Sequence, residues 1–191
     1  HFVFHPMGAP ASPSDPTMGF ALAGGQAFAW YDVVAAMGLS GLGSFDVYAA
    51  GGNAPLVLAR IFNDAGTAGT TGFTESLVEV DDVQAPGSGA SVTGALVCPI
   101  LVDRFRYNVG LRTVGAPVHV NVRVRDSAGA EIHSVAHDYP ADYFIQSTVT
   151  DFLDGFAIGD GQWLEITFSG GGLIIYGATI DNTTNDPSAQ F

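Results

Sequence analysis

The sequence predicts an all-β protein made of two similar modules. Its clearest pattern is at residues 118–125, where four valines alternate with His, Asn and Arg, as in a strand with one buried and one wet face. The chain holds 25 glycines and is 11% aromatic, a composition that favours strands joined by turns. Residues 55–70 and residues 173–187 share one design, an apolar strand that runs into a polar turn.

In the first half, strands are expected at residues 1–5, 17–22, 44–49 and 56–62. A proline-rich loop at residues 6–16 separates the first two of these strands. Residues 31–37 suit a short helix, with Asp32 near its start, where a carboxylate can accept from the exposed N–H groups, and Gly38 after its end.

In the second half, strands are expected at residues 95–102, 104–113, 118–124, 131–137 and 173–180, with a short helix at residues 150–156. The acidic and Gly/Ser-rich segment between the halves marks a surface connection. The predicted organisation is a first module at 1–78, a linker at 79–93 and a second module at 94–191.

Three blocks of the two halves align at one spacing of 119 residues without a gap. Residues 31–34 (YDVV), 44–47 (SFDV) and 60–63 (RIFN) match residues 150–153 (TDFL), 163–166 (WLEI) and 179–182 (TIDN). Few residues are identical, but a shared spacing indicates an internal duplication more simply than chance does.

The second half resembles an immunoglobulin-like β-sandwich module that occurs in tandem in large secreted or cell-surface bacterial proteins. The resemblance rests on RFRYNVG at residues 104–110, the D-x-x-G hairpin at Asp126–Gly129 and the DNTTNDP close at residues 181–187. It covers residues 95–191 well and residues 1–75 more weakly. It implies a non-catalytic, extracellular, immunoglobulin-like fold and brings no known active site.

Compared with the second module, the first lacks its opening strand. His1–His5 takes the place of the strand at 118–124, and nothing in the sequence precedes it. A missing strand leaves unpaired backbone groups, which is costly. Two explanations stay open: the chain is a piece of a longer protein, or another chain supplies the strand. The expected assembly edge is formed by His1, Phe2, Val3, Phe4 and His5.

Charge and cysteine content limit the partners. The net charge is −13, with six Arg and no Lys, which disfavours nucleic acids and anionic membranes. No apolar run approaches the roughly 18 to 20 residues of a membrane span. The single Cys98 excludes an internal disulfide, and its apolar neighbours predict a buried, inert thiol. This is compatible with a secreted bacterial protein.

The strongest metal candidate in the sequence is the turn that contains Asp181, Asn182 and Asp186, whose oxygen donors suit calcium. Such residues also populate turns by bonding their own backbone. The cluster Glu79, Asp81 and Asp82 is a weaker candidate. A copper site at His1 and His5 is disfavoured, because those side chains would lie about 13 Å apart on a strand.

The histidines of the 118–137 hairpin form another candidate pair. If Arg125 opposes Glu131, His119 faces His137 and Arg123 faces His133, all on the wet face. Two imidazoles at that distance could share a metal, although a solvated sheet surface is the favoured interpretation.

No catalytic motif stands out, and the chain is not expected to be an enzyme. The expected function is that of an extracellular structural subunit, such as part of a filament, that self-associates or joins adjoining modules by strand complementation and apolar packing. The alternative is a carbohydrate- or surface-ligand-binding module of a larger secreted protein, whose stacking residues would be drawn from the aromatics Trp30, Tyr31, Tyr143 and Trp163.

Overall fold

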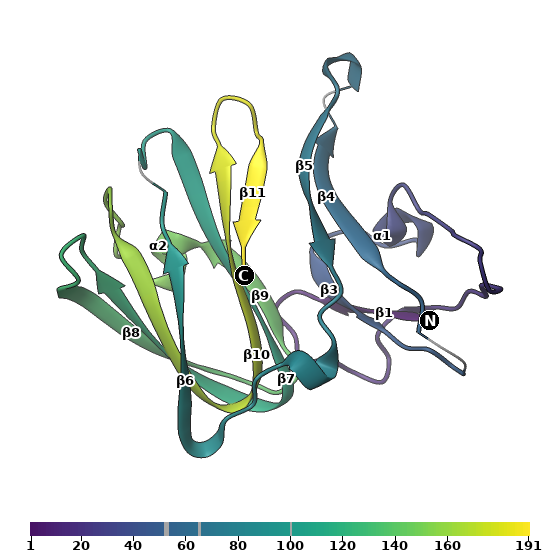
Figure 1. Ribbon diagram of the computed structural model, residues 1–191, viewed down its shortest axis with the longest axis horizontal. Helices are drawn as coiled ribbons and strands as arrows, with labels where there is room; N and C mark the ends of the chain where they lie inside the picture. The colour runs from purple at the N-terminus through teal and green to yellow at the C-terminus, as the bar shows by residue number, and fades with distance from the viewer. Residues whose placement is uncertain (52–53, 65, 100) are drawn as a thin grey trace.

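The computed structural model describes residues 1–51, 54–64, 66–99 and 101–191, and it confirms the all-β prediction. The paired strands are antiparallel and form three sheets (Figure 1). The strands are β1 (Phe2–Pro6), β2 (Thr17–Met18), β3 (Gly43–Val47), β4 (Leu58–Asp64), β5 (Thr70–Ser76), β6 (Gly87–Val97), β7 (Phe105–Arg125), β8 (Glu131–Tyr139), β9 (Phe144–Thr148), β10 (Trp163–Asp181) and β11 (Pro187–Gln190). The helical segments are α1 (Val33–Ala36), α2 (Val149–Phe152), η1 (Gly66–Ala68) and η2 (Val80–Asp82).

Two long strands, β7 and β10, organise the C-terminal half (residues 84–191). Residues 118–125 of β7 pair with residues 163–170 of β10, and β8 and β6 flank this pair. Residues 105–114 of β7 pair with residues 172–181 of β10, and β9 and β11 flank that pair. The sequence predicts separate strands at 104–113 and 118–124, whereas the structure has one strand that passes through both layers.

Glycines form the corner where the sheet turns from one layer into the other. The pairing of β7 with β10 is irregular between Gly170 and Gly172, and Gly170 has a φ of 100°. A β-carbon on Gly170 would overlap the carbonyl oxygen of Pro117, and one on Gly171 would overlap that of Ala116. Only residues without a side chain allow the two backbones to approach so closely.

The hydrophobic core lies between these two layers. The alternating valines of β7 face inward, as the sequence predicts, and are at most 2% exposed. Leu164 and Ile166 of β10 belong to the same cluster, together with Leu111 from the other layer and Leu153 just after α2. The core residues are Leu96, Cys98, Tyr107, Val109, Leu111, Val118, Val120, Val122, Val124, Val149, Phe152, Leu153, Leu164, Ile166, Phe168 and Leu173.

The two short helices are capped by different residues. The Asp32 side chain accepts from the Ala35 N–H at 2.8 Å, as expected for the start of α1. At α2 the cap is Thr148, whose hydroxyl oxygen accepts from the Asp151 N–H at 3.1 Å. The second helix therefore begins at Val149, one residue before the predicted segment, and its cap is not aspartate.

The N-terminal half (residues 1–83) holds two small sheets, β2-β1-β3 and β4-β5, to the right in Figure 1. Among its described residues, those classed as buried are Phe2, Phe4 and His5. Phe2 contacts the rings of Phe20 and Trp30 at 4.9 and 5.3 Å between centroids, so the local packing is aromatic. No core comparable to that of the C-terminal half forms among these residues.

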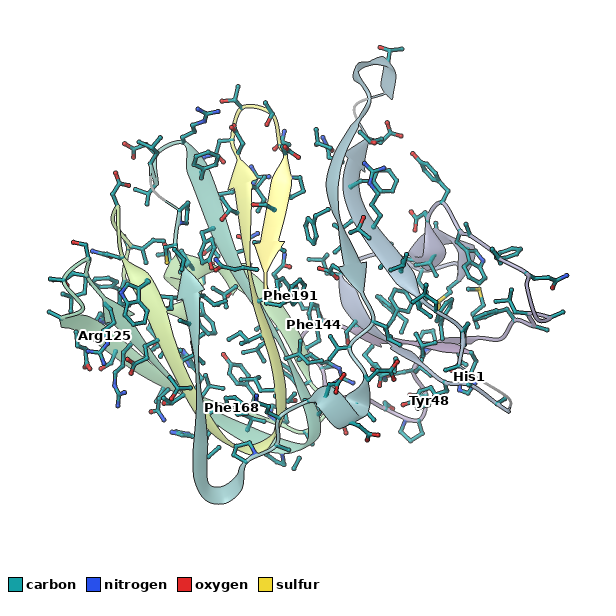
Figure 2. The ribbon with its side chains drawn as sticks, viewed as in Figure 1. His1, Tyr48, Arg125, Phe144, Phe168 and Phe191 are labelled. Carbon is teal, nitrogen blue, oxygen red and sulfur yellow. The ribbon has the colours of Figure 1, made fainter. Side chains whose placement is uncertain are left out.

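Backbone contacts join the halves. Pro10 forms a β-bridge with Tyr143, and the Gly8 N–H donates to the Phe144 carbonyl at 2.9 Å. Figure 2 shows Phe144 and Phe191 between the two groups of strands. β6 begins at Gly87, inside the segment predicted as a linker, so the second sheet recruits part of that segment.

Within the described part of the chain, no helix is long and apolar enough to cross a membrane.

Candidate assembly surface

The β4–β5 hairpin and the residues just before it carry several exposed apolar side chains. β4 pairs with β5 over its whole length, from Leu58 opposite Ser76 to Asp64 opposite Thr70. The side chains of Leu56, Leu58 and Ile61 are nevertheless 89%, 61% and 51% exposed. An isolated two-stranded hairpin is marginally stable in water. This hairpin is contacted by the Tyr31 ring at Phe62 and by β11 along β5, and these contacts leave the three side chains open to solvent.

Exposed apolar side chains concentrate in the N-terminal half. Among the side chains that the structure describes, fifteen large hydrophobic ones are exposed, of which eleven precede residue 84 and four follow it. The eleven are Met7, Leu22, Phe28, Tyr31, Leu42, Tyr48, Leu56, Leu58, Ile61, Val78 and Val80. Single exposed apolar residues are ordinary, but a whole half with so little burial is typical of an interaction surface.

The 119-residue spacing found in the sequence allows the strands of the two halves to be compared. At the 119-residue spacing, β1 and β3 correspond to the parts of β7 and β10 around residues 121–125 and 162–166, and both pairs are antiparallel neighbours. β4 corresponds to residues 177–183, the end of β10 and the start of its turn. In the C-terminal half that end of β10 lies between β7 and β11, whereas β5 is the one strand paired with β4 among the described residues.

Ile61 and its counterpart Ile180, 119 residues later, differ strongly in the exposed fraction of their side chains. Ile180 lies directly opposite Arg106 of β7 and is 8% exposed, whereas Ile61 is 51% exposed. The same residue type at the equivalent position is therefore covered in one half and open in the other. Among the described residues one edge of β4 is unpaired, whereas both edges of the corresponding part of β10 are paired.

The strand at His1–His5 is not an edge. β1 lies between β2 and β3, with Phe2 paired to both Met18 and Val47. The Phe4 N–H also donates to the Pro16 carbonyl at 2.9 Å. The open edge expected at His1–His5 is therefore covered at Phe2 and Val3, where the short strand β2 folds back from the proline-rich loop. In the sequence, residues 60–63 align with residues 179–182, at the end of β10. That alignment was the sequence signal that pointed to β4.

A buried polar cluster fixes β1 to the C-terminal half. His5 is 5% exposed, and its Nδ1 and Nε2 lie 2.6 Å from Asp15 Oδ2 and 3.0 Å from Asp46 Oδ2. Arg112 of β7, itself 8% exposed, donates to the same Asp46 oxygen at 3.3 Å. Burial raises the pKa of Asp15, but the Ser12 N–H and the His5 ring outweigh it and hold that pKa below its ordinary value. Sequence patterns gave no signal for this cluster, since its members come from distant segments.

Two arginines donate hydrogen bonds to the turn at residues 181–186, which the sequence suggested as a calcium site. Asp181 Oδ2 accepts from Arg104 Nε and Nη2 at 3.1 and 2.8 Å, and its Oδ1 accepts from the Thr183 N–H at 2.7 Å. The Thr183 N–H and the Arg104 guanidinium hold the pKa of Asp181 below its ordinary value. Asn182 Oδ1 accepts from Arg106 at 3.1 Å. Two of the predicted calcium ligands thus already face cations.

The other acidic candidates are not drawn together into a metal site. Asp186 contributes its backbone carbonyl to the Asp181 N–H, closing the turn. Asp81 and Asp82 lie in η2 with Glu79 as its cap, all three exposed. Across residues 1–51, 54–64, 66–99 and 101–191, no three His, Cys, Asp or Glu side chains are arranged to hold a metal ion.

The histidine pairing expected on the β7–β8 hairpin is wrong, because a β-bulge shifts the register. Arg125 does oppose Glu131, but the next pair is Val124 with His133. His119 therefore faces Asp138, with 2.7 Å between Nδ1 and Oδ1, and not His137. The bulge also moves His133 and His137 to the inner face, where their Nε2 atoms lie 3.2 and 3.0 Å from the carbonyl oxygens of Leu153 and Phe152.

Of the four aromatic residues considered for sugar stacking, Tyr31 is open to solvent. It is 73% exposed, its ring contacts Phe62 at 5.3 Å, and its hydroxyl donates to Asp64 at 2.5 Å. Trp30, Tyr143 and Trp163 are partly buried. Tyr31 is the member of the set that presents a ring edge and polar groups together.

Cys98 is buried, as predicted. It is 3% exposed, and burial raises the pKa of its thiol to about 12, so the thiol is protonated at neutral pH. A protonated, inaccessible thiol is a poor nucleophile.

Comparisons with protein-family models, curated proteins and solved structures give no significant match.

Proposed function

We propose that this chain is a secreted or cell-surface structural subunit that assembles by strand addition at the free edge of β4. In this proposal the two halves are immunoglobulin-like β-sandwich modules, and the first module receives its opening strand from a neighbouring chain. The donated strand would run antiparallel to β4, as β7 does to the equivalent part of β10.

The observation that carries this proposal is the contrast between Ile61 and Ile180. Covering Ile61 to the extent of Ile180 removes apolar surface from water, and each Å² so buried stabilises the complex by about 25 cal/mol before the costs of association. The strand would also satisfy the N–H and C=O groups on the outer edge of β4.

The charge of the chain bears on the conditions for assembly. Each subunit carries −13, and eight of the nineteen acidic residues lie in the N-terminal half beside a single cation, Arg60. Like charges repel at close approach, and salt screens them over about 8 to 10 Å. Assembly is therefore expected to strengthen as the salt concentration rises.

Sedimentation velocity and negative-stain electron microscopy test the proposal over a series of protein and salt concentrations. Wild-type chain should form larger species as both rise, whereas Ile61→Lys should stay monomeric because a charge replaces the apolar contact. Ile132→Lys is the matched control, since Ile132 is 41% exposed on β8 in the other half. A wild-type chain that stays monomeric throughout, or an Ile61→Lys variant that assembles as wild type does, would refute the proposal.

A second candidate function is carbohydrate binding at Tyr31. The support is its 73% exposed ring, whose hydroxyl donates to Asp64 and which contacts Phe62, the ring that Arg60 covers; this combination of stacking and hydrogen-bonding groups suits a sugar. A glycan array with wild-type and Tyr31→Ala chains tests it. Binding that disappears in Tyr31→Ala supports this function, and the absence of any wild-type binding rejects it.

A further inference from the structure

The turn between β10 and β11 contains an acceptor sequence for N-linked glycosylation. Asn182, Thr183 and Thr184 form Asn-x-Thr with a residue other than proline in the middle. None of the other five asparagines in the sequence is followed at the second position by Ser or Thr. The motif is short, so its position in the fold has to decide whether it can carry a glycan.

That position is open. Residues 182–186 are all exposed, and the turn projects beyond the ends of β10 and β11 (Figure 1). The turn is held by hydrogen bonds that do not use Asn182 Nδ2: the Thr183 N–H donates to Asp181 Oδ1, and the Asn182 N–H donates to the Arg104 carbonyl at 3.0 Å. A bulky group on Asn182 would therefore extend into solvent without disturbing the turn.

The orientation of the Asn182 amide suits the modification. Arg106 donates to one atom of the amide at 3.1 Å, and because guanidinium only donates, that atom is the oxygen Oδ1. Nδ2 has no hydrogen-bond partner among the described residues. An N-linked sugar replaces one hydrogen of Nδ2 and leaves Oδ1 an acceptor, so the Arg106 contact would survive the modification.

We propose that Asn182 Nδ2 carries an N-linked glycan. In the transfer, Nδ2 forms a bond to C1 of the first sugar of a lipid-pyrophosphate-linked oligosaccharide. The bond from C1 to the pyrophosphate oxygen breaks, the pyrophosphate leaves with the electron pair, and a base of the transferase takes one amide proton. This inference rests on the secreted location included in the proposed function.

A glycan on Asn182 would lie on the side of the molecule formed by β5 and β11. The Thr71 hydroxyl of β5 donates to the Asn185 carbonyl at 3.3 Å, so the modified turn lies against β5. β4 is on the other side of β5, and its outer edge faces away from this contact. A glycan on Asn182 would cover the β5 and β11 edges and leave the β4 edge open for assembly.

Peptide mass spectrometry of protein purified from its natural source tests the proposal. Chymotrypsin should release residues 177–191 with an added oligosaccharide mass, and peptide-N-glycosidase in heavy-oxygen water should convert Asn182 to labelled Asp. In the same host, Thr184→Ala should abolish the added mass, whereas the conservative Thr184→Ser should retain it. An unmodified peptide from protein found outside the cell overturns the glycan alone; an unmodified peptide from protein found only in the cytosol overturns the secreted location as well.

Discussion

Each ring nitrogen of His5 lies within 3.0 Å of a carboxylate oxygen, Asp15 on one side and Asp46 on the other. The ring donates to both only when both nitrogens carry a proton. Arg112 also donates to Asp46, so two carboxylates, an imidazole and a guanidinium meet where β1, β3 and β7 come together. The cluster therefore links the N-terminal half, in which few residues are buried, to the C-terminal half, which holds the hydrophobic core.

Replacement of His5 by Gln should destabilise the folded chain by roughly 1 to 3 kcal/mol, because the single amide nitrogen of Gln replaces two ring nitrogens that contact Asp15 and Asp46, so at least one contact with a carboxylate is lost. Urea unfolding followed by circular dichroism gives the difference. The control is His119→Gln, which alters a solvent-exposed pair with Asp138 and should change stability by less than about 0.5 kcal/mol. Equal effects of the two substitutions would contradict the role given to His5.

Asp181 gives a pH-dependent prediction. Its pKa lies below the ordinary value of 3.8, with the Thr183 N–H and Arg104 as the main causes. A lowered folded-state pKa contributes stability above the unfolded value and loses it as the pH falls through the folded value. Asp181→Asn should therefore be less stable than wild type at pH 7, and the gap should narrow below about pH 3.8. Thermal melts across pH 2 to 7 measure this; a gap independent of pH would show that the carboxylate charge has no role.

Residue-level chemistry was only partly predictable from the sequence. The buried Cys98 and the cap at Asp32 follow from neighbouring residues, and both are found. The His5 cluster could not be foreseen, because Asp46 and Arg112 reach it through strand pairing across distant segments. The side-chain oxygens of Asp181 and Asn182 were recognised as potential metal ligands. Their hydrogen bonds to Arg104 and Arg106 were not foreseen.

At the scale of elements, glycine positions and one bulge decide the geometry. The alternating valines fixed the buried face of β7 correctly from sequence. A one-residue bulge near Ile132 then reversed the face predicted for β8, because the side-chain period of a strand is two residues. Bulges carry little sequence signal, so the inward turn of His133 and His137 needed the structure.

Gly170→Ala tests the corner between the two layers. Its φ of 100° is unfavourable for alanine, and the new methyl group would overlap the Pro117 carbonyl. The expected loss is at least about 1 to 3 kcal/mol, measured by urea unfolding. Gly129→Ala is the comparison, because φ is also positive there, at 85°. No heavy atom beyond its chain neighbours lies within 4 Å of the position of a β-carbon, so the only cost is that of placing alanine in a left-handed backbone conformation. If the corner is as described, Gly170→Ala should be the more damaging of the two.

At the scale of the whole molecule, one chain combines a packed half and an open half. The core of the C-terminal half draws on both layers, whereas Phe2, Phe4 and His5 are the residues classed as buried among those described before residue 84. The sequence predicts an internal duplication with a missing strand, and it places the open edge at His1–His5. In the structure β2 lies beside β1, whereas β4 pairs with β5 alone among the described strands.

Hydrogen exchange should separate the two halves before and after assembly. In dispersed monomers, amides of β4 should exchange much faster than those of residues 118–125 of β7, because few buried contacts hold the β4–β5 hairpin closed. When the chain assembles, a donated strand would pair with the outer edge of β4 and slow exchange at Leu58–Asp64, while β7 should change little. Ile61→Lys should show the fast exchange of the monomer under both conditions. Slowing confined to the C-terminal half, with β4 unchanged, would place the contact elsewhere, since no strand can add to β4 without protecting its amides.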